Sequence, residues 1–170
     1  NNLGVAYFNL GDYKAAEVYY KQSAEIRKKV LGEEHPDYAS TLNNLGNFYS
    51  NMGDYNSAEP LYKKALEIHV QSLGEEHPHY TSILNNLGLC YFNMGDYKRA
   101  EPLLKVSLEI DKKALGEGHP DYASSLNNLG LLYSNMGDYK AAEPYIKQSL
   151  EIDKKVLGEE HPDYAIALSN

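Results

Sequence analysis

The chain has 170 residues, of which 42% are hydrophobic, and its 16 Lys and Arg against 24 Asp and Glu give a formal net charge of −8. Such an acidic chain has no net positive field to hold phosphates, so we expect neither a nucleic-acid partner nor attraction to an anionic membrane. A single cysteine excludes an internal disulfide, and because no apolar run is long enough to cross a bilayer and no secretory signal is present, we expect a soluble, cytoplasmic protein.

The sequence repeats itself every 42 residues from end to end. The units that begin at Asn43 and Asn127 agree at 26 of 42 positions, as a count along the two segments shows. The repeat phases are 1–42, 43–84, 85–126 and 127–168, with an incomplete helix at each terminus. We therefore expect one tandem array, and its phase predicts that the chain is a fragment of a longer one.

Each unit contains two predicted helices. In the second unit, apolar residues recur at steps of three and four over 38–52, which predicts a first helix, here called helix A. The same pattern over 55–73 predicts helix B. Gly53 ends helix A, Asp54 is a suitable N-cap for helix B, and Pro78 fits the first turn of the next helix A. Each unit is therefore predicted to be an antiparallel helix hairpin.

Small residues and prolines recur at fixed places in these helices. Glycine in the middle of helix A costs roughly 1 kcal/mol relative to alanine, which suggests that another helix packs closely there. We expect it to face the alanine column of helix B: Gly4, Gly46, Gly88 and Gly130 against Ala16, Ala58, Ala100 and Ala142. Pro60, Pro102 and Pro144 predict a kink or a delayed first turn in helix B. The predicted fold class is all-α, an α-α superhelix (solenoid) of stacked hairpins.

The pattern Leu42-x2-Leu45-Gly46-x2-Tyr49, followed by Ala58-x3-Tyr62, resembles the tetratricopeptide repeat (TPR), whose pattern is W-x2-L-G-x2-Y and then A-x3-F. Leu replaces the Trp, Tyr replaces the Phe, and the unit is eight residues longer than the usual 34. The longer unit is similar to the repeats of kinesin light chain and of bacterial tandem-repeat proteins. The resemblance implies a non-catalytic scaffold, without cofactors, that binds a protein or peptide in a concave groove lined by helices A.

The polar side of helix A is the predicted peptide-binding surface, because an Asn side chain both donates and accepts hydrogen bonds and can pair with the backbone of an extended peptide. The alternative is that Asn44, Asn86 and Asn128 tie neighbouring helices together. The predicted binding residues are Asn43, Asn44, Asn47, Asn51, Asn85, Asn86, Leu89, Phe92, Asn93, Asn127, Asn128, Leu131 and Asn135.

Columns that vary between repeats are candidates for ligand anchors. Phe92, Leu89 and Leu131 are predicted to form an apolar pocket for a ligand side chain. The alternative is that Phe8 and Phe92 simply pack against adjacent A helices.

The charged and reactive residues argue against other site types. Every Lys and Arg falls in a helix B, so the groove lacks the basic clamp with which chaperone-adaptor members of the family hold a C-terminal carboxylate, and a strongly acidic ligand is also put in doubt. The His that precedes Pro in each loop is expected to start a helix rather than to bind a metal. Cys90 is expected to be a packed residue, and no catalytic set is recognisable, so we expect no enzyme activity and no metal site.

The predicted function is a protein-protein interaction scaffold. Two alternatives remain open: an architectural spacer or oligomerisation element, and the regulatory repeat arm of a larger, NTPase-containing protein. Residues 1–10 and 162–170 are two pieces of the same helix A, which predicts weak head-to-tail self-association.

Overall fold

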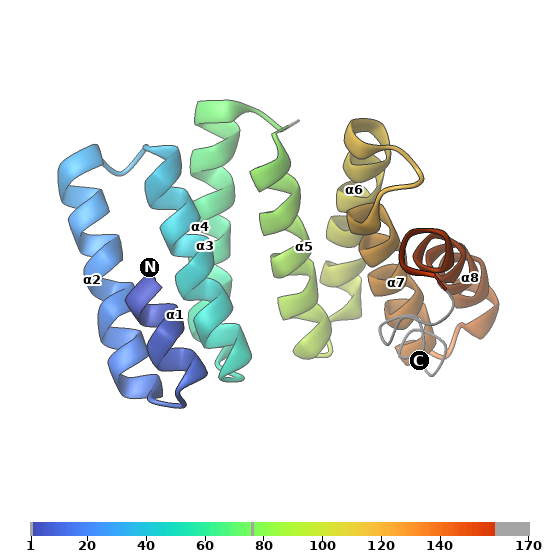
Figure 1. Ribbon diagram of the computed structural model, residues 1–170, viewed down its shortest axis with the longest axis horizontal. Helices are drawn as coiled ribbons and strands as arrows, with labels where there is room; N and C mark the ends of the chain where they lie inside the picture. Colours follow the sequence, from blue (N-terminus) through green and yellow to red (C-terminus); the bar gives the residue numbers. More distant parts are fainter. Residues whose placement is uncertain (1, 76, 159–170) are drawn as a thin grey trace. The chain divides into compact units, whose positions relative to one another are not determined.

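A computed structural model describes residues 2–75 and 77–158, and within them the chain forms helices and no strands (Figure 1). The chain divides into two compact units, residues 1–90 and 91–170. The boundary lies near the end of helix α5 (Pro78–Asn93). The first half of a further predicted helix A, residues 162–170, lies outside the described residues.

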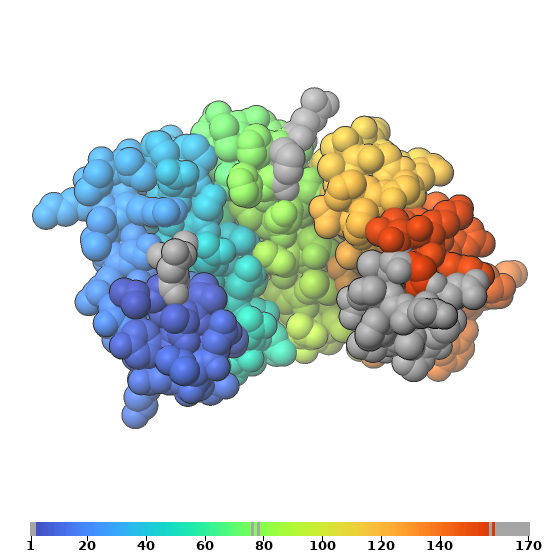
Figure 2. All heavy atoms as spheres, viewed as in Figure 1, coloured from blue at the N-terminus to red at the C-terminus, as the bar shows by residue number. Residues whose placement is uncertain are grey.

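Unit 1 contains two helix hairpins and most of α5. The first hairpin is α1 (Asn2–Asn9) and α2 (Tyr13–Leu31), and the second is α3 (Pro36–Asn51) and α4 (Tyr55–Leu73). Helices α1 and α3 contribute adjoining atoms to the visible face of this unit (Figure 2), and the rings of Phe8 and Phe48 meet edge to face with centroids 6.1 Å apart. Phe8 therefore packs against the adjacent A helix, as the alternative interpretation of this column held.

Unit 2 contains the last residues of α5 and then α6 (Tyr97–Leu115), α7 (Pro120–Asn135) and α8 (Tyr139–Leu157). Helix α7 contacts both α6 and α8. Its side chains Leu126, Leu129 and Leu132 are almost completely buried. The predicted helix pairs are thus present in both units; in the second repeat helix B has the predicted bounds 55–73, whereas helix A covers 36–51 instead of 38–52.

The predicted helix starts are confirmed. Asp54 accepts a hydrogen bond from the backbone N–H of Ser57 at 3.1 Å, and Asp12, Asp96 and Asp138 do the same at their helices. His35 and His119 accept through Nδ1 from the backbone N–H two residues later, so these rings cap helices.

The expectation that proline delays the first turn of helix B was wrong. Helix α4, with Pro60, begins at its Tyr and has 19 residues, like α2, which has Val18 at that position.

The glycine column faces a different residue from the one expected. A Cβ atom on Gly46 would lie 2.7 Å from the ring of Tyr62, and one on Gly130 would lie 2.5 Å from Ile146. The partner is therefore four residues beyond the predicted alanine, one turn further along helix B. Glycine is required here because an aromatic or branched side chain of helix B occupies the space that a Cβ would need.

Repeated polar contacts connect consecutive hairpins. In unit 1, the Tyr49 hydroxyl donates to Glu17 Oε1 at 2.8 Å, and Lys21 contacts the same oxygen at 2.6 Å. The ammonium of Lys21 and the Tyr49 hydroxyl lower the pKa of Glu17. In unit 2, Tyr133, Glu101 and Lys105 repeat the arrangement at 2.8 and 2.7 Å. These contacts explain why the Tyr, Glu and Lys columns recur.

Candidate peptide-binding surface

The predicted binding residues of unit 1 lie on α3 and α5. Helix α3 contains no Lys or Arg, and its Asn43, Asn44 and Asn47 side chains are half-buried whereas Asn51 is exposed. On α5, the side chains of Asn85, Asn86 and Leu89 are likewise half-buried. The surface is therefore polar, uncharged and partly accessible.

Asn47 is held within its own hairpin. Its Oδ1 accepts a hydrogen bond from the Tyr62 hydroxyl at 2.7 Å, and Tyr62 is almost completely buried. Burial raises the pKa of Tyr62, which keeps the hydroxyl protonated as a donor. The sequence does not reveal this pair, because the first repeat has Tyr20 in the Tyr62 column but Val5 in the Asn47 column, and the third and fourth repeats have apolar residues in both.

Asn43 and Asn86 bind each other. The Asn86 side-chain amide donates to Asn43 Oδ1 at 3.0 Å, across from α5 to α3. This contact is of the kind that the alternative interpretation described, an Asn that ties neighbouring helices together. Each of these two side chains retains hydrogen-bonding capacity beyond this one contact, because an amide has two donor hydrogens and an acceptor oxygen.

Asn44 has no hydrogen-bond partner for its side chain within residues 2–75 and 77–158. The same holds for Asn51 at the end of α3. Asn44 is half-buried, so only part of its side chain is in contact with water. This is the geometry in which a hydrogen bond to a ligand would be partly shielded from water.

Unit 2 presents the corresponding residues on the end of α5 and on α7. Asn127, Asn128 and Leu131 are half-buried, and Asn127 resembles Asn44 in having no hydrogen-bond partner for its side chain among the described residues. The Asn135 amide donates to the Leu131 carbonyl at 2.9 Å, so its donor is used within α7. Asn93 is exposed at the end of α5.

The predicted apolar pocket involves residues of both units. Leu89 belongs to unit 1, whereas Phe92 and Leu131 belong to unit 2. The Phe92 ring lies against Tyr97 of α6, with centroids 5.8 Å apart. The pocket itself stays a prediction.

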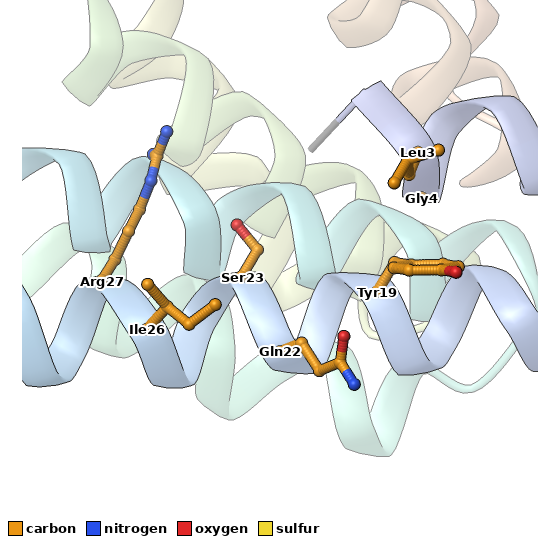
Figure 3. Close-up of a pocket in the computed structure, with 7 residues that line it drawn as sticks. All are labelled: Leu3, Gly4, Tyr19, Gln22, Ser23, Ile26 and Arg27. Carbon is orange, nitrogen blue, oxygen red and sulfur yellow. The ribbon is translucent and has the colours of Figure 1, made fainter.

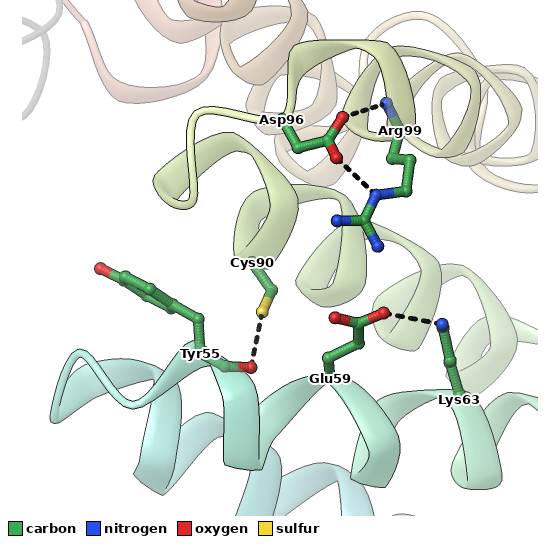
Figure 4. A network of polar contacts seen from close by, with 6 residues as sticks. All are labelled: Tyr55, Glu59, Lys63, Cys90, Asp96 and Arg99. Atoms are coloured by element: carbon green, nitrogen blue, oxygen red, sulfur yellow. Dashed lines mark hydrogen bonds and ion pairs between the residues drawn. The ribbon is translucent and has the colours of Figure 1, made fainter.

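Basic residues of the B helices pair with nearby acids. Lys64 of α4 contacts Glu67 at 3.0 Å, which confirms the expected pairing at helical spacing. Figure 4 shows two further ion pairs, Lys63 with Glu59 at 2.7 Å in unit 1 and Arg99 with Asp96 at 2.6 Å in unit 2.

Cys90 has no reactive setting. The residue is completely buried, as expected, and its Sγ donates to the Tyr55 carbonyl at 3.7 Å (Figure 4). Among residues 2–75 and 77–158, no group of three His, Cys, Asp or Glu is arranged to hold a metal ion.

A hollow lies between α1 and α2, apart from the predicted peptide-binding residues. It encloses about 550 Å³ and is lined by Leu3, Gly4, Tyr19, Gln22, Ser23, Ile26 and Arg27 (Figure 3). The side chain of Ile26 is 62% exposed, whereas its counterpart Ile68 in the second hairpin is 1% exposed. Helix α1 has 8 residues and α3 has 16, so the longer A helix accounts for the difference.

Comparison with known proteins identifies the family. A family model described as Tetratricopeptide repeat matches residues 1–69, 37–113, 81–155 and 121–170, and these overlapping matches together span the chain. The chain belongs to the tetratricopeptide repeat family. Tetratricopeptide repeats support a role as a protein-interaction scaffold, and their fold is typically non-enzymatic.

Solved structures confirm the predicted fold class, an all-α solenoid of helix hairpins. The crystal structure of BtubC (BKLC) from P. vanneervenii superposes with a TM-score of 0.82 at 28% identity, covering 94% of this chain and 63% of that one. A putative kinesin light chain of Podosopora anserina, with nearly identical TPR-like repeats, gives a TM-score of 0.84 at 26% identity and covers 98% and 79%. The resemblance to kinesin-light-chain repeats is thus confirmed.

A curated relative matches over a shorter stretch. A nucleotide-binding leucine-rich repeat (NLR)-like protein of Hyaloscypha variabilis is 42% identical over 43 residues, which are 25% of this chain and 4% of that protein. This tetratricopeptide chain therefore spans only a small part of the curated protein and less than two thirds of BtubC. In the part of the chain that the structure describes, no helix has the length and apolarity to span a membrane.

Proposed function

We propose that this tetratricopeptide chain binds an extended segment of a partner protein along the polar faces of its A helices. The surface consists of the predicted residues of α3, α5 and α7, and the amides that it offers are centred on Asn44 in unit 1 and Asn127 in unit 2. The chain performs no chemistry in this role and requires no cofactor. Its cytoplasmic location is part of the same proposal.

The observation that supports this proposal is that Asn44 and Asn127, half-buried amides from two neighbouring columns of the repeat, have no hydrogen-bond partner among the described residues and lie on helices without Lys or Arg. A half-buried amide that stays unpaired loses part of its hydration and gains nothing in return, which is a cost of the order of 1 kcal/mol. A ligand backbone would remove that cost, because its carbonyl and N–H groups match the amide N–H and oxygen.

The charges restrict the ligand. With no Lys or Arg on α3 or α7, and a chain charge of −8, a strongly acidic peptide would meet repulsion and no counter-charge. We therefore propose a neutral or basic segment that contacts the A helices mainly through its backbone.

A displayed library of random peptides, selected on the immobilised 170-residue chain, tests this function. Binders that saturate, compete with one another and lose affinity in an Asn44→Ala variant are expected. A library that yields no saturable binder would support the architectural alternative.

The NLR-like relative favours a second candidate, in which the array is the repeat arm of a larger protein that contains a nucleotide-hydrolysing domain. The sequence that flanks the array in its gene decides this candidate. The two roles are compatible, since a repeat arm can also bind a partner.

A further inference from the structure

One position of helix B holds Arg27 in the first repeat, His69 in the second and Asp in the third and fourth, and in the first and third repeats it bonds to the start of the next helix A. In the first repeat, Arg27 donates through Nη1 to the Asp37 carbonyl at 2.9 Å and to Thr41 Oγ1 at 2.8 Å. In the third repeat, Asp111 accepts from the Ser125 hydroxyl at 2.6 Å. Both polar groups are therefore paired across the junction of two repeats.

The second repeat has His69 at this position, and its ring has no such partner. The residue is 0% exposed, and neither ring nitrogen has a hydrogen-bond partner. The reason is visible in the sequence: Ile83 stands where Thr41 and Ser125 provide hydroxyls in the other repeats. A neutral imidazole tolerates this environment at a modest cost, whereas an imidazolium would be a buried charge without a counter-ion.

The rings of two further histidines are stacked beside the His69 ring. The centroid of His69 lies 6.2 Å from that of His77, in the loop after α4, and 5.7 Å from that of His79, on α5. The His77 and His79 rings lie 5.2 Å apart. All three pairs are stacked, with interplanar angles of 19° to 29°. We call these three residues the histidine cluster.

Among the described residues, no ion pair joins an acid to this cluster, and the charges that act on His69 come from the other two histidines. The first and third repeats have Asp37 and Asp121 where His79 stands, so an acidic residue has been exchanged for a third imidazole. Burial is the main cause that lowers the pKa of His69, and the fields of His79 and His77 lower it further. Those two imidazoles, one from the loop and one from α5, are the titratable groups that act on it.

We propose that the histidine cluster makes the junction between the second and third repeats sensitive to protons, so that acidification loosens the packing of the start of α5 on the end of α4. The three rings stack while they are neutral. Protonation of His69 places a cation in a completely buried site, and its ring must leave the packed junction to reach water, whereas protonation of His77 and His79 places repelling cations at ring-centroid distances of 5.2 to 6.2 Å.

The sign follows from proton linkage. Because the folded-state pKa of His69 is depressed below its ordinary value of 6.5, the loosened state binds more protons than the packed state in acid. The contribution of the cluster to stability is thus fully present above about pH 6.5 and is lost as the pH falls below it.

Urea unfolding of the 170-residue chain at about pH 7.5 and about pH 5.5 tests the proposal. The wild-type midpoint should fall on acidification, and His69→Leu should remove a large part of that fall. His35→Gln and His119→Gln are matched controls, because they remove the helix-capping histidines of other repeats, and they should keep the wild-type pH shift. An unchanged shift in His69→Leu would overturn the proposal.

Two measurements keep the test decisive if His69→Leu folds poorly. His79→Asp restores the residue found in the first and third repeats, gives a protonated His69 a counter-charge, and should reduce the pH shift. NMR titration of the wild-type His69 ring should show a midpoint below 6.5. A midpoint at or above that value, or a strong rise in stability with Zn²⁺ or Ni²⁺ that His69→Leu abolishes, would contradict a proton-sensitive junction, the latter in favour of a metal site.

Discussion

Inside the α3–α4 hairpin, a single methyl group on Gly46 would lie 2.7 Å from the Tyr62 ring, whereas two residues earlier Asn44 meets no described hydrogen-bond partner. Both residues recur in every repeat, as Gly4, Gly88 and Gly130 and as Asn2, Asn86 and Asn128. The Gly46 column, which packing requires, and the Asn44 column, whose packing role is slight at this repeat, are therefore repeated alike. Only the contacts distinguish the interior of a hairpin from its open face.

This difference between Gly46 and Asn44 shows how residues that bind a ligand can be distinguished from residues that pack in a repeat array. Where a repeated residue fills space or forms an internal bond, its repetition is explained by folding. Where a repeated polar residue is half-buried and has no partner among the described residues, as Asn44 does, binding is one explanation, beside the link between helices that Asn86 of the same column forms. The same comparison separates Asn47, which Tyr62 uses, from Asn44, which nothing described uses.

The largest expected effect is on the interior. Gly46→Ala should lower the free energy of unfolding by up to about 2 kcal/mol, because a cost of overpacking of about 1 to 3 kcal/mol is offset by a gain of roughly 1 kcal/mol in helix propensity. Tyr62 is 1% exposed and has little room to move. Chemical denaturation provides the measurement. Gly118→Ala is the matched control, since nothing lies within 4 Å of a Cβ there, and it should be neutral.

An intermediate effect is expected at the boundary between interior and open face. Asn47→Leu leaves the buried Tyr62 hydroxyl without its acceptor and should cost roughly 1 to 3 kcal/mol. Tyr62→Phe should cost about 1 kcal/mol, and the double variant should cost clearly less than the sum. A double-mutant cycle of unfolding free energies measures the coupling. Strict additivity would mean that the hydrogen bond between the two residues contributes nothing.

A smaller effect concerns association of the 170-residue chain. The hollow beside Leu3 and Ile26 belongs to the first hairpin, and the first half of α3 covers the corresponding position in the second hairpin. The stretch 162–168 has a similar sequence to 36–42, where α3 begins. We expect weak head-to-tail association, visible in light scattering as a mass that rises with concentration. Ile26→Lys should suppress it, and Val30→Lys, an exposed control on the same helix that does not line the hollow, should not. A constant monomeric mass would refute the prediction.

The sequence predicted the fold well because the physical causes of the helices are local. Apolar spacing, Asp N-caps and glycines after helix A all act within a few residues, so a single repeat contains them. A wrong expectation came from contacts between helices. The columns show which positions are constant but not which columns face each other, and the glycine was matched to Ala58 instead of Tyr62.

The candidate site was less predictable for the same reason. Asn43, Asn47 and Asn86 were assigned to a ligand, yet each forms at least one internal hydrogen bond. The histidine cluster escaped notice because His69 and His79 belong to separate columns that hold other residues elsewhere. Only the three-dimensional structure brings them to His77.

The central claim is that the unpaired amides of the A helices bind a ligand. Its most direct test is the affinity of a selected peptide for the wild-type chain and for a variant with Asn44→Ala and Asn127→Ala. We expect unchanged stability, within about 0.5 kcal/mol, and a loss of roughly fivefold in affinity for each amide that the peptide contacts. Lys98→Ala with Lys140→Ala, two exposed changes on B helices, should bind like the wild type. Full affinity in the asparagine variant, or equal losses in both variants, would contradict the claim.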